Sequence, residues 1–131
     1  MKARQLMAAS LGIACACLVF SATPCRAGGA AEPGRAVLDK LLKAVEADDY
    51  GSFVADGTDT FKAAITKERL EMVSTHLAPR MKKGYECTYL GELKQQGYQV
   101  VLWKMTYKDG GDDTLARLVL KDGKVAGFVL Q

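Results

Sequence analysis

The 131-residue sequence is poor in the residue types that build metal sites and disulfide frameworks. It has one histidine and four cysteines, and Cys15, Cys17 and Cys25 all lie within the first 27 residues. If those residues are removed, only Cys87 remains, which excludes a disulfide framework within one chain. No cluster of histidine and cysteine is present, so we expect neither a metal site nor a cofactor.

The chain also lacks an excess of charge of one sign. The formal net charge is +3, but Lys2, Arg4 and Arg26 lie in the first 27 residues, and without them 15 basic residues balance 15 acidic ones. Nucleic-acid-binding proteins normally carry a basic stripe, so no nucleic-acid partner is expected. A phosphate loop, a nucleophile elbow and a paired-carboxylate signature are missing too, and the sequence does not reveal a reaction.

Residues 1–27 have the layout of a secretory signal peptide. Lys2 and Arg4 give a positive start, residues 6–22 are apolar and uncharged, and small residues precede the expected cleavage after Ala27. We therefore expect an exported protein, periplasmic or extracellular, with no membrane attachment once the signal is removed. The alternative is an uncleaved anchor, for which the 17-residue apolar run is at the short limit.

Residues 28–34 form a flexible lead-in, and residues 35–131 are long enough for one domain with a single core. Apolar spacing predicts three helices, with a connector over the intervening stretch that is anchored through Phe61. The helices are expected at about 35–48, 50–55 and 67–83, with the connector at 58–64. Pro79 predicts a kink or break near residues 77–78 in the third helix, which ends at Gly84.

After Gly84 the apolar residues alternate as they do in strands. Four strands are expected, at 85–93, 98–107, 114–120 and 125–130. Asp122-Gly123 between two apolar runs is typical of a type I′ hairpin turn. Helices followed by a four-stranded antiparallel meander predict an α+β domain.

The pairing of the strands follows from the polarity of their side chains. We expect a three-residue first loop with Gly97 in the left-handed position, because this register gathers the aromatic and sulfur-containing side chains on one face. The expected pairs in this hairpin are Tyr85 with Tyr107, Cys87 with Met105, and Tyr89 with Trp103. Those in the last hairpin are Leu120 with Val125 and Leu118 with Gly127. The middle loop is expected to be asymmetric or bulged, since a symmetric one would oppose Lys104 and Arg117.

Both faces of the predicted sheet carry many apolar residues, as in the run Val100–Trp103. A sheet with one wet face should alternate cleanly between apolar and polar residues, and the helices can cover only one face. We therefore expect a second copy of the chain to cover the other face, which gives a homodimer. The alternative is that this face meets a different protein, so that the chain is a periplasmic interaction module.

Several motifs along residues 35–131 resemble those of a known superfamily. They are Asp48-Asp49-Tyr50, Tyr89-Leu90-Gly91, Leu102-Trp103-Lys104-Met105-Thr106-Tyr107 and the run from Leu118 to Phe128. The chain resembles small exported members of the nuclear transport factor two-like superfamily, whose cone-shaped fold is also called cystatin-like or ketosteroid-isomerase-like. The resemblance implies a curved sheet around a long helix, a pocket between them and dimers through the sheet. It implies no reaction, because this superfold hosts enzymes and non-catalytic modules alike.

Five residues are candidates for a site that binds a small apolar ligand in the cone. They are Tyr89, Trp103, Met105, Tyr107 and His76. The first four share the aromatic face and would line the pocket, with plain core as the alternative. We expect a non-catalytic protein. The alternative is a small acid–base enzyme, isomerase- or hydrolase-like, that uses a pocket tyrosine and a helix-borne group such as His76 or Asp49.

Three further features are given structural interpretations. The aspartates of loop 108–113 lack the alternation and the closing glutamate of a calcium loop, so we expect a solvated turn. The basic cluster around Arg80 complements the dipole at the end of its helix. Cys87 is interpreted as buried filler, with an intermolecular bridge and a reactive thiol as the alternatives.

Overall fold

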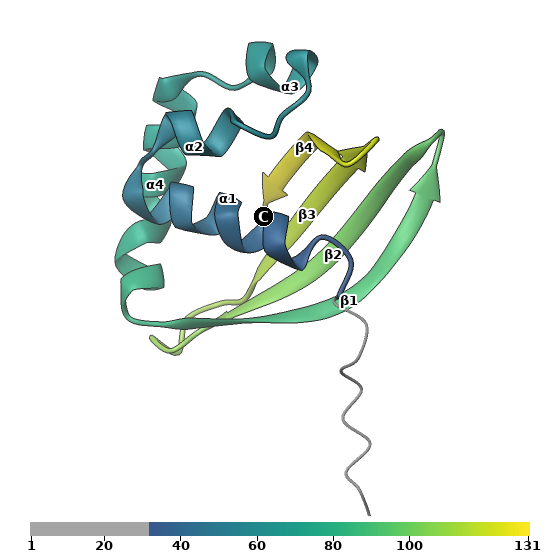
Figure 1. Cartoon of the computed structure of the whole chain (residues 1–131). Coiled ribbons are helices and arrows are strands. Elements are labelled where there is room, and N and C mark those ends of the chain that lie inside the picture. The colour runs from purple at the N-terminus through teal and green to yellow at the C-terminus, as the bar shows by residue number, and fades with distance from the viewer. Residues whose placement is uncertain (1–31) are drawn as a thin grey trace, which may run out of the picture.

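The computed structural model describes residues 32–131, so the predicted signal peptide and most of the lead-in lie outside the described residues. Four helices precede four strands along this part of the chain (Figure 1). The elements are α1 Arg35–Ala47, α2 Tyr50–Val54, α3 Asp59–Ala64, α4 Lys67–Lys82, β1 Tyr85–Gln95, β2 Tyr98–Tyr107, β3 Thr114–Lys121 and β4 Lys124–Leu130. Within residues 32–131, no helix is both long enough and apolar enough to cross a membrane.

The four strands form one antiparallel sheet in the order β1-β2-β3-β4, so each strand pairs with its neighbour in the sequence. Figure 1 shows the helices on one side of a curved sheet, and in the described part of the chain no element covers the other side. We call the side that faces the helices the inner face and the opposite side the outer face. The predicted fold class, an α+β domain with helices on a curved four-stranded meander, is confirmed.

The first hairpin has the expected pairs, but its turn is shorter than predicted and its first strand contains a bulge. Tyr85 lies opposite Tyr107, Cys87 opposite Met105 and Tyr89 opposite Trp103. The three-residue loop is wrong, because Gln95 pairs with Tyr98 across a two-residue turn in which Gln96 and Gly97 both have positive φ. A bulge at Leu90 supplies the missing one-residue offset and keeps the aromatic residues on the inner face.

The last hairpin also contains a bulge that the sequence analysis did not include. Its pairs are Leu120 with Val125, as predicted, and Leu118 with Phe128 instead of Gly127. The extra residue is Ala126, which has no direct partner on β3. Before the bulge, the amide of Val125 donates to the carbonyl of Asp56 at 2.8 Å, and its carbonyl accepts from the Thr58 amide at 2.8 Å. The loop before α3 therefore pairs with the backbone of β4 at Val125, on the side of that strand that faces away from β3.

The core lies between α1 and the inner face of the sheet. The predicted stripe of α1 is confirmed, since Leu38, Leu41, Leu42 and Val45 are all at most 3% exposed. They pack with the inner-face residues Val101, Trp103, Met105 and Leu118. Full burial of one such aliphatic side chain is worth about 1.5–3 kcal/mol. The start of α1 lies so near the sheet that a Cβ at Gly34 would be 3.0 Å from Leu118 Cδ2.

Two expectations about the helices are wrong. Residues 59–64 form α3 instead of a connector, because the Thr58 hydroxyl accepts a hydrogen bond from the Phe61 amide and caps the helix. The anchoring role of Phe61 is confirmed by its 3% exposure. The predicted break near residues 77–78 is absent, since α4 continues through Pro79 to Lys82. Ala78 and Met81, on either side of the proline, are buried, so packing holds this turn in place.

The buried side of α4 differs from the stripe that the apolar spacing predicts, which is Leu70, Val73, Leu77 and Met81. The buried side consists of Leu70, Ser74, Ala78 and Met81. The Ser74 hydroxyl donates to the carbonyl of Val45 at 2.6 Å, which joins α4 to α1 through a small buried residue. The residues turned away from this contact are consequently exposed, with Met72 at 64% and Val73 at 38%.

Candidate ligand-binding groove

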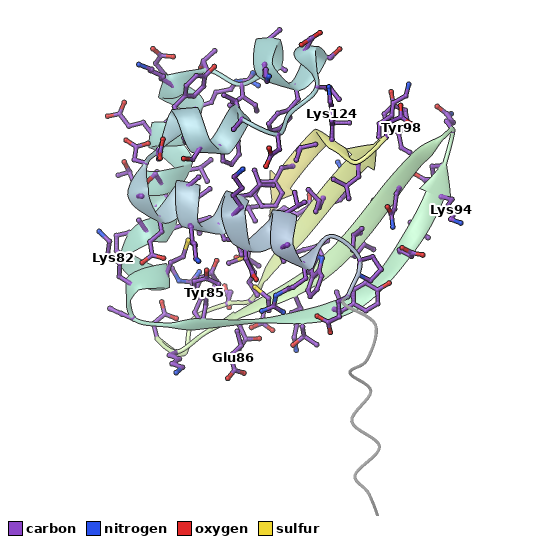
Figure 2. All side chains as sticks on the ribbon, in the orientation of Figure 1. Lys82, Tyr85, Glu86, Lys94, Tyr98 and Lys124 are labelled. Carbon is purple, nitrogen blue, oxygen red and sulfur yellow. The ribbon has the colours of Figure 1, made fainter. Side chains whose placement is uncertain are left out.

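The four aromatic and sulfur-containing candidates lie in or beside the core. Trp103 and Met105 are fully buried, and Tyr107 is 3% exposed. Tyr89 is half-buried and meets the Trp103 ring edge-on, with 5.3 Å between ring centroids. Figure 2 illustrates the alternation of β1, with Tyr85 directed toward the helices and Glu86 away from them. None of the four lines a hollow found in the described part of the chain, and their role in ligand binding stays a prediction.

Arg35 lies over this aromatic group at the start of α1. Its guanidinium is 5.3 Å from the centroid of the Trp103 ring and donates to the carbonyl of Cys87 at 3.3 Å. Asp39 accepts a second bond from Arg35 at 3.1 Å. The Trp103 indole N–H has no hydrogen-bond partner among residues 32–131. The side of the core under α1 is therefore filled, and Arg35 covers it.

A groove lies between α4 and the edge strand β4. It consists of two hollows of about 380 and 310 Å³, both of which are lined by Met72, Val73 and Leu130. The first hollow is completed by His76, Leu77, Thr114 and Gln131. The second is completed by Val45, Phe53, Ile65, Arg69, Leu70 and Phe128. The volumes are at the lower end of the range for small-molecule sites, which are concave and mostly apolar.

The second hollow has a floor of packed aromatic rings. The ring centroid of Phe53 is 5.8 Å from that of Phe61 and 6.0 Å from that of Phe128. Val45 and Leu70 are buried beside them. This part of the groove therefore offers an ordered apolar surface from α1, α2, α4 and β4.

His76 is the one predicted site residue that lines the groove. Its Nδ1 donates to the carbonyl of Met72 at 2.8 Å, one helical turn earlier. Thr114 lines the same hollow, and its hydroxyl accepts a bond from the Tyr107 hydroxyl at 3.1 Å. Tyr107 itself does not line the hollow, so of the aromatic group only its hydrogen-bond partner Thr114 reaches the groove.

Asp49, the other helix-borne candidate, lies elsewhere. It caps α2, where its carboxylate accepts bonds from the Ser52 hydroxyl at 2.7 Å and the Ser52 amide at 3.1 Å. These bonds lower the pKa of Asp49. No aspartate or glutamate lines either hollow of the groove. No aspartate or glutamate of the groove could therefore serve as a base beside His76.

The groove residues that the sequence analysis missed come from α4 and β4. The apolar spacing places Val73 in the core stripe of α4, and no pattern in the sequence marks Met72, Phe128 or Leu130 as site residues. Met72 and Val73 lie next to the buried side of α4 and widen its apolar surface. An apolar surface wider than the core contact needs is the feature of the sequence that could have indicated a binding site on α4. The predicted meander already places β4 at the sheet edge, but its position next to α4 follows only from the tertiary structure.

The loop between β2 and β3 is tied to the end of α4. Arg80 donates to the carboxylate of Asp109 at 2.8 Å and to the carbonyl of Asp112 at 2.9 Å, and its guanidinium carbon is 3.9 Å from the centroid of the Tyr107 ring. Hydrogen bonds from Arg80 and from the Gly111 amide lower the pKa of Asp109 to about 2. Residues 108–113 are all exposed, as expected for a solvated turn, and Arg80 does more than complement the helix dipole because it ties this turn to α4.

The predicted asymmetry of the same loop is confirmed, because Met105 pairs with Thr114. Lys104 therefore lies opposite Leu115 and avoids Arg117. Within residues 32–131, no group of three or more histidine, cysteine, aspartate or glutamate side chains could hold a metal ion.

The outer face of the sheet carries both apolar and charged residues. Its apolar residues are Leu93, Val100, Leu102, Leu115, Val119 and Val129, which we call the outer patch. Its charged residues are Glu86, Lys104, Arg117, Lys121 and Lys124, of which Arg117 lies between Leu102 and Val129 in the middle of the face. One row, Leu93–Val100–Val119–Gly127, crosses all four strands without a charge. In the described part of the chain no helix lies on this face (Figure 1).

No family model matches the sequence, and no curated protein matches it. Among solved structures, the chain is similar to a cystatin-fold protein from Novosphingobium aromaticivorans, with 15% identity, a TM-score of 0.38 and coverage of 73% of this chain and 95% of that one. It is similar to an NTF2-like protein from Cytophaga hutchinsonii, with 9% identity, a TM-score of 0.39 and coverage of 79% and 93%. An NTF2-like protein from Burkholderia thailandensis has 15% identity, a TM-score of 0.32 and coverage of 73% and 87%.

The descriptions of these three proteins carry the fold names to which the sequence motifs had pointed. The class of this chain is defined by its own helices and sheet, an α+β domain with a curved four-stranded meander.

Proposed function

We propose that the protein is an exported, non-catalytic binding domain that takes a small apolar ligand in the groove between α4 and β4. The observation that carries this proposal is the groove itself, an apolar recess whose floor is made of ordered rings. Exposed apolar side chains at its rim, Met72 and Val73, would be covered by a ligand. The lining contains no aspartate or glutamate side chain, which favours binding over acid–base chemistry.

Binding of a fluorescent apolar probe, displaced by straight-chain alcohols of increasing length, tests this proposal. Each buried methylene contributes about 0.8 kcal/mol, so we expect the affinity to rise about fourfold per carbon until the groove is filled. Val73→Glu places a charge in the groove and is expected to abolish binding. Thr75→Glu, at an exposed position of the same helix, is the matched control and should bind normally. Equal binding by both variants would refute the groove as the site.

A second proposal concerns assembly: we propose that the outer patch meets the outer patch of a second copy in a homodimer. The support is the uncharged row across all four strands, which lies on a face that no helix of the described chain covers. A two-fold dimer buries the same patch twice, and the uncharged row would form the core of the interface, with Lys104, Lys121 and Lys124 toward its rim.

The dimer is tested by measuring the mass of the protein in solution by light scattering. Leu102→Glu and Val119→Glu, on the outer face, are expected to give folded monomers. Leu118→Glu, on the inner face, should fail to fold, because it buries an unpaired charge in the core. Thr75→Glu should keep the mass of the wild type. A wild-type monomer at high micromolar concentration would exclude the dimer and leave a different protein as the occupant of the outer patch.

Export is proposed from the sequence of residues 1–27 alone. Expression of the full chain with its N-terminus intact, followed by N-terminal sequencing of the product, is expected to find cleavage at or near Ala27. A product that retains Met1 in the cytosolic fraction would contradict it.

A further inference from the structure

Arg69 is the one arginine or lysine that lines the groove, and it lies at the end near Ile65. It is exposed, and no carboxylate within residues 32–131 forms an ion pair with it. The guanidinium is always protonated at physiological pH and presents several donors in one plane. A permanent positive charge is therefore held beside an otherwise apolar recess.

The acidic residues nearest to Arg69 in the sequence are engaged elsewhere. Glu68 accepts from its own amide and from the Thr66 hydroxyl at the start of α4, and these bonds lower its pKa. Glu71 lies on another side of the helix, where it lines a separate hollow with Asp48 and Lys67. Neither carboxylate lines the groove, so the charge of Arg69 is not neutralised there.

The rest of the groove suits an alkyl chain. From Arg69 the apolar lining continues along α4 past Met72 and Val73 to His76. Seven residues of α-helix span about 10 Å, so the groove is elongated along this side of α4. The opposite wall contains Leu130 in both hollows, with Phe128 in the second and Thr114 and Gln131 in the first. The shape and the charge together are complementary to a molecule with an apolar tail and one anionic end.

We infer that the ligand of the groove is a single-chain amphiphile whose anionic head, a carboxylate or a phosphate, binds Arg69 while its alkyl chain extends toward His76. This inference rests on the proposed function and specifies the chemical class of the ligand. Arginine can bind either head through two parallel hydrogen bonds, which are stronger than bonds between neutral groups. The carboxylate of a fatty acid and the phosphate of a single-chain lipid share this chemistry.

The test compares four ligands with the same ten-carbon chain by calorimetric titration of the purified protein: decanoate, decyl phosphate, decanol and decyltrimethylammonium. We expect both anions to bind at least tenfold more tightly than decanol, and the cation to bind most weakly. Whichever anion binds more tightly identifies the type of head that the site prefers.

Variants assign the effect to Arg69. Arg69→Gln should lose about tenfold in affinity for the anions and leave decanol binding unchanged, whereas Arg69→Lys should retain part of the affinity. Lys82→Gln removes a positive charge from an exposed position of the same helix that lines neither hollow, and it is the matched control. If decanol binds as tightly as decanoate, or if Arg69→Gln behaves like Lys82→Gln, the inference is overturned while the groove proposal stands. If none of the four ligands binds, both fail.

Discussion

The close contact between α1 and α4 depends on Ser74, and its replacement gives a quantitative test of that packing. The side chain is 5% exposed, and its hydroxyl bonds to the Val45 carbonyl at 2.6 Å. That carbonyl also accepts from the Asp48 amide, but at 3.3 Å. Ser74→Ala removes a bond worth about 1 kcal/mol and gains about 0.5 kcal/mol in helix propensity. We therefore expect a net loss of about 0.5 kcal/mol in the free energy of unfolding.

Ser74→Val adds the cost of volume to the loss of the bond. Extra carbons in a packed interface cost about 1–3 kcal/mol, so we expect the free energy of unfolding to fall by about 2–4 kcal/mol. For a domain of about 100 residues, 1 kcal/mol corresponds to about 4–8 °C in Tm. Urea titration and thermal melting followed by circular dichroism measure both variants. Thr75→Val, at the next and exposed position, is the control and should change stability by about 0.5 kcal/mol at most. If Ser74→Val and Ser74→Ala are equally stable, the two helices are not in close contact at this point.

Three further predictions test other parts of the structure. Pro79→Ala, at an exposed position within α4, should raise the free energy of unfolding by about 1–3 kcal/mol, because it restores the backbone N–H and removes the ring; an unchanged urea midpoint would contradict this. The pKa of Asp109 is lowered, so its contribution is full above its unfolded value of about 4 and is lost as the pH falls through about 2. The difference in Tm between wild type and Asp109→Asn should accordingly be constant above about pH 5 and shrink toward pH 2, whereas a difference that stays constant down to pH 2 would refute the role of Arg80. Burial raises the pKa of the Cys87 thiol, although Arg35 opposes the shift, so iodoacetamide should modify it several-fold more slowly in the native protein than in urea; equal rates would show a reactive thiol.

The elements with a strong local period could be predicted from the sequence. The stripe of α1 and the alternation of β1 and β2 lead directly to the observed core, and the pairing of Tyr89 with Trp103 follows from sorting side chains by polarity. The bulges at Leu90 and Ala126 could not be found in this way. A bulge shifts the register by one residue, and no residue type in the sequence marks its position. A two-residue turn with a bulge and a three-residue loop without one therefore give the same pairs near the start of β1.

The candidate site was predicted less well than the fold, for a physical reason. The largest side chains, Trp103 and Tyr107, attract attention in the sequence, but their size lets them fill the core completely. The recess lies between α4 and the last strand, where the two elements leave a gap. Such a gap is a property of how two elements are placed, which no local pattern records.

The bulge at Leu90 has a consequence for how the molecule avoids aggregation. β1 is an edge strand of the sheet, and the free backbone groups of an edge strand can pair with a strand from another molecule. The bulge interrupts the regular ladder in the middle of this strand, and Glu86, Glu92 and Lys94 surround it with charge. Strand-to-strand polymerisation through β1 is therefore disfavoured.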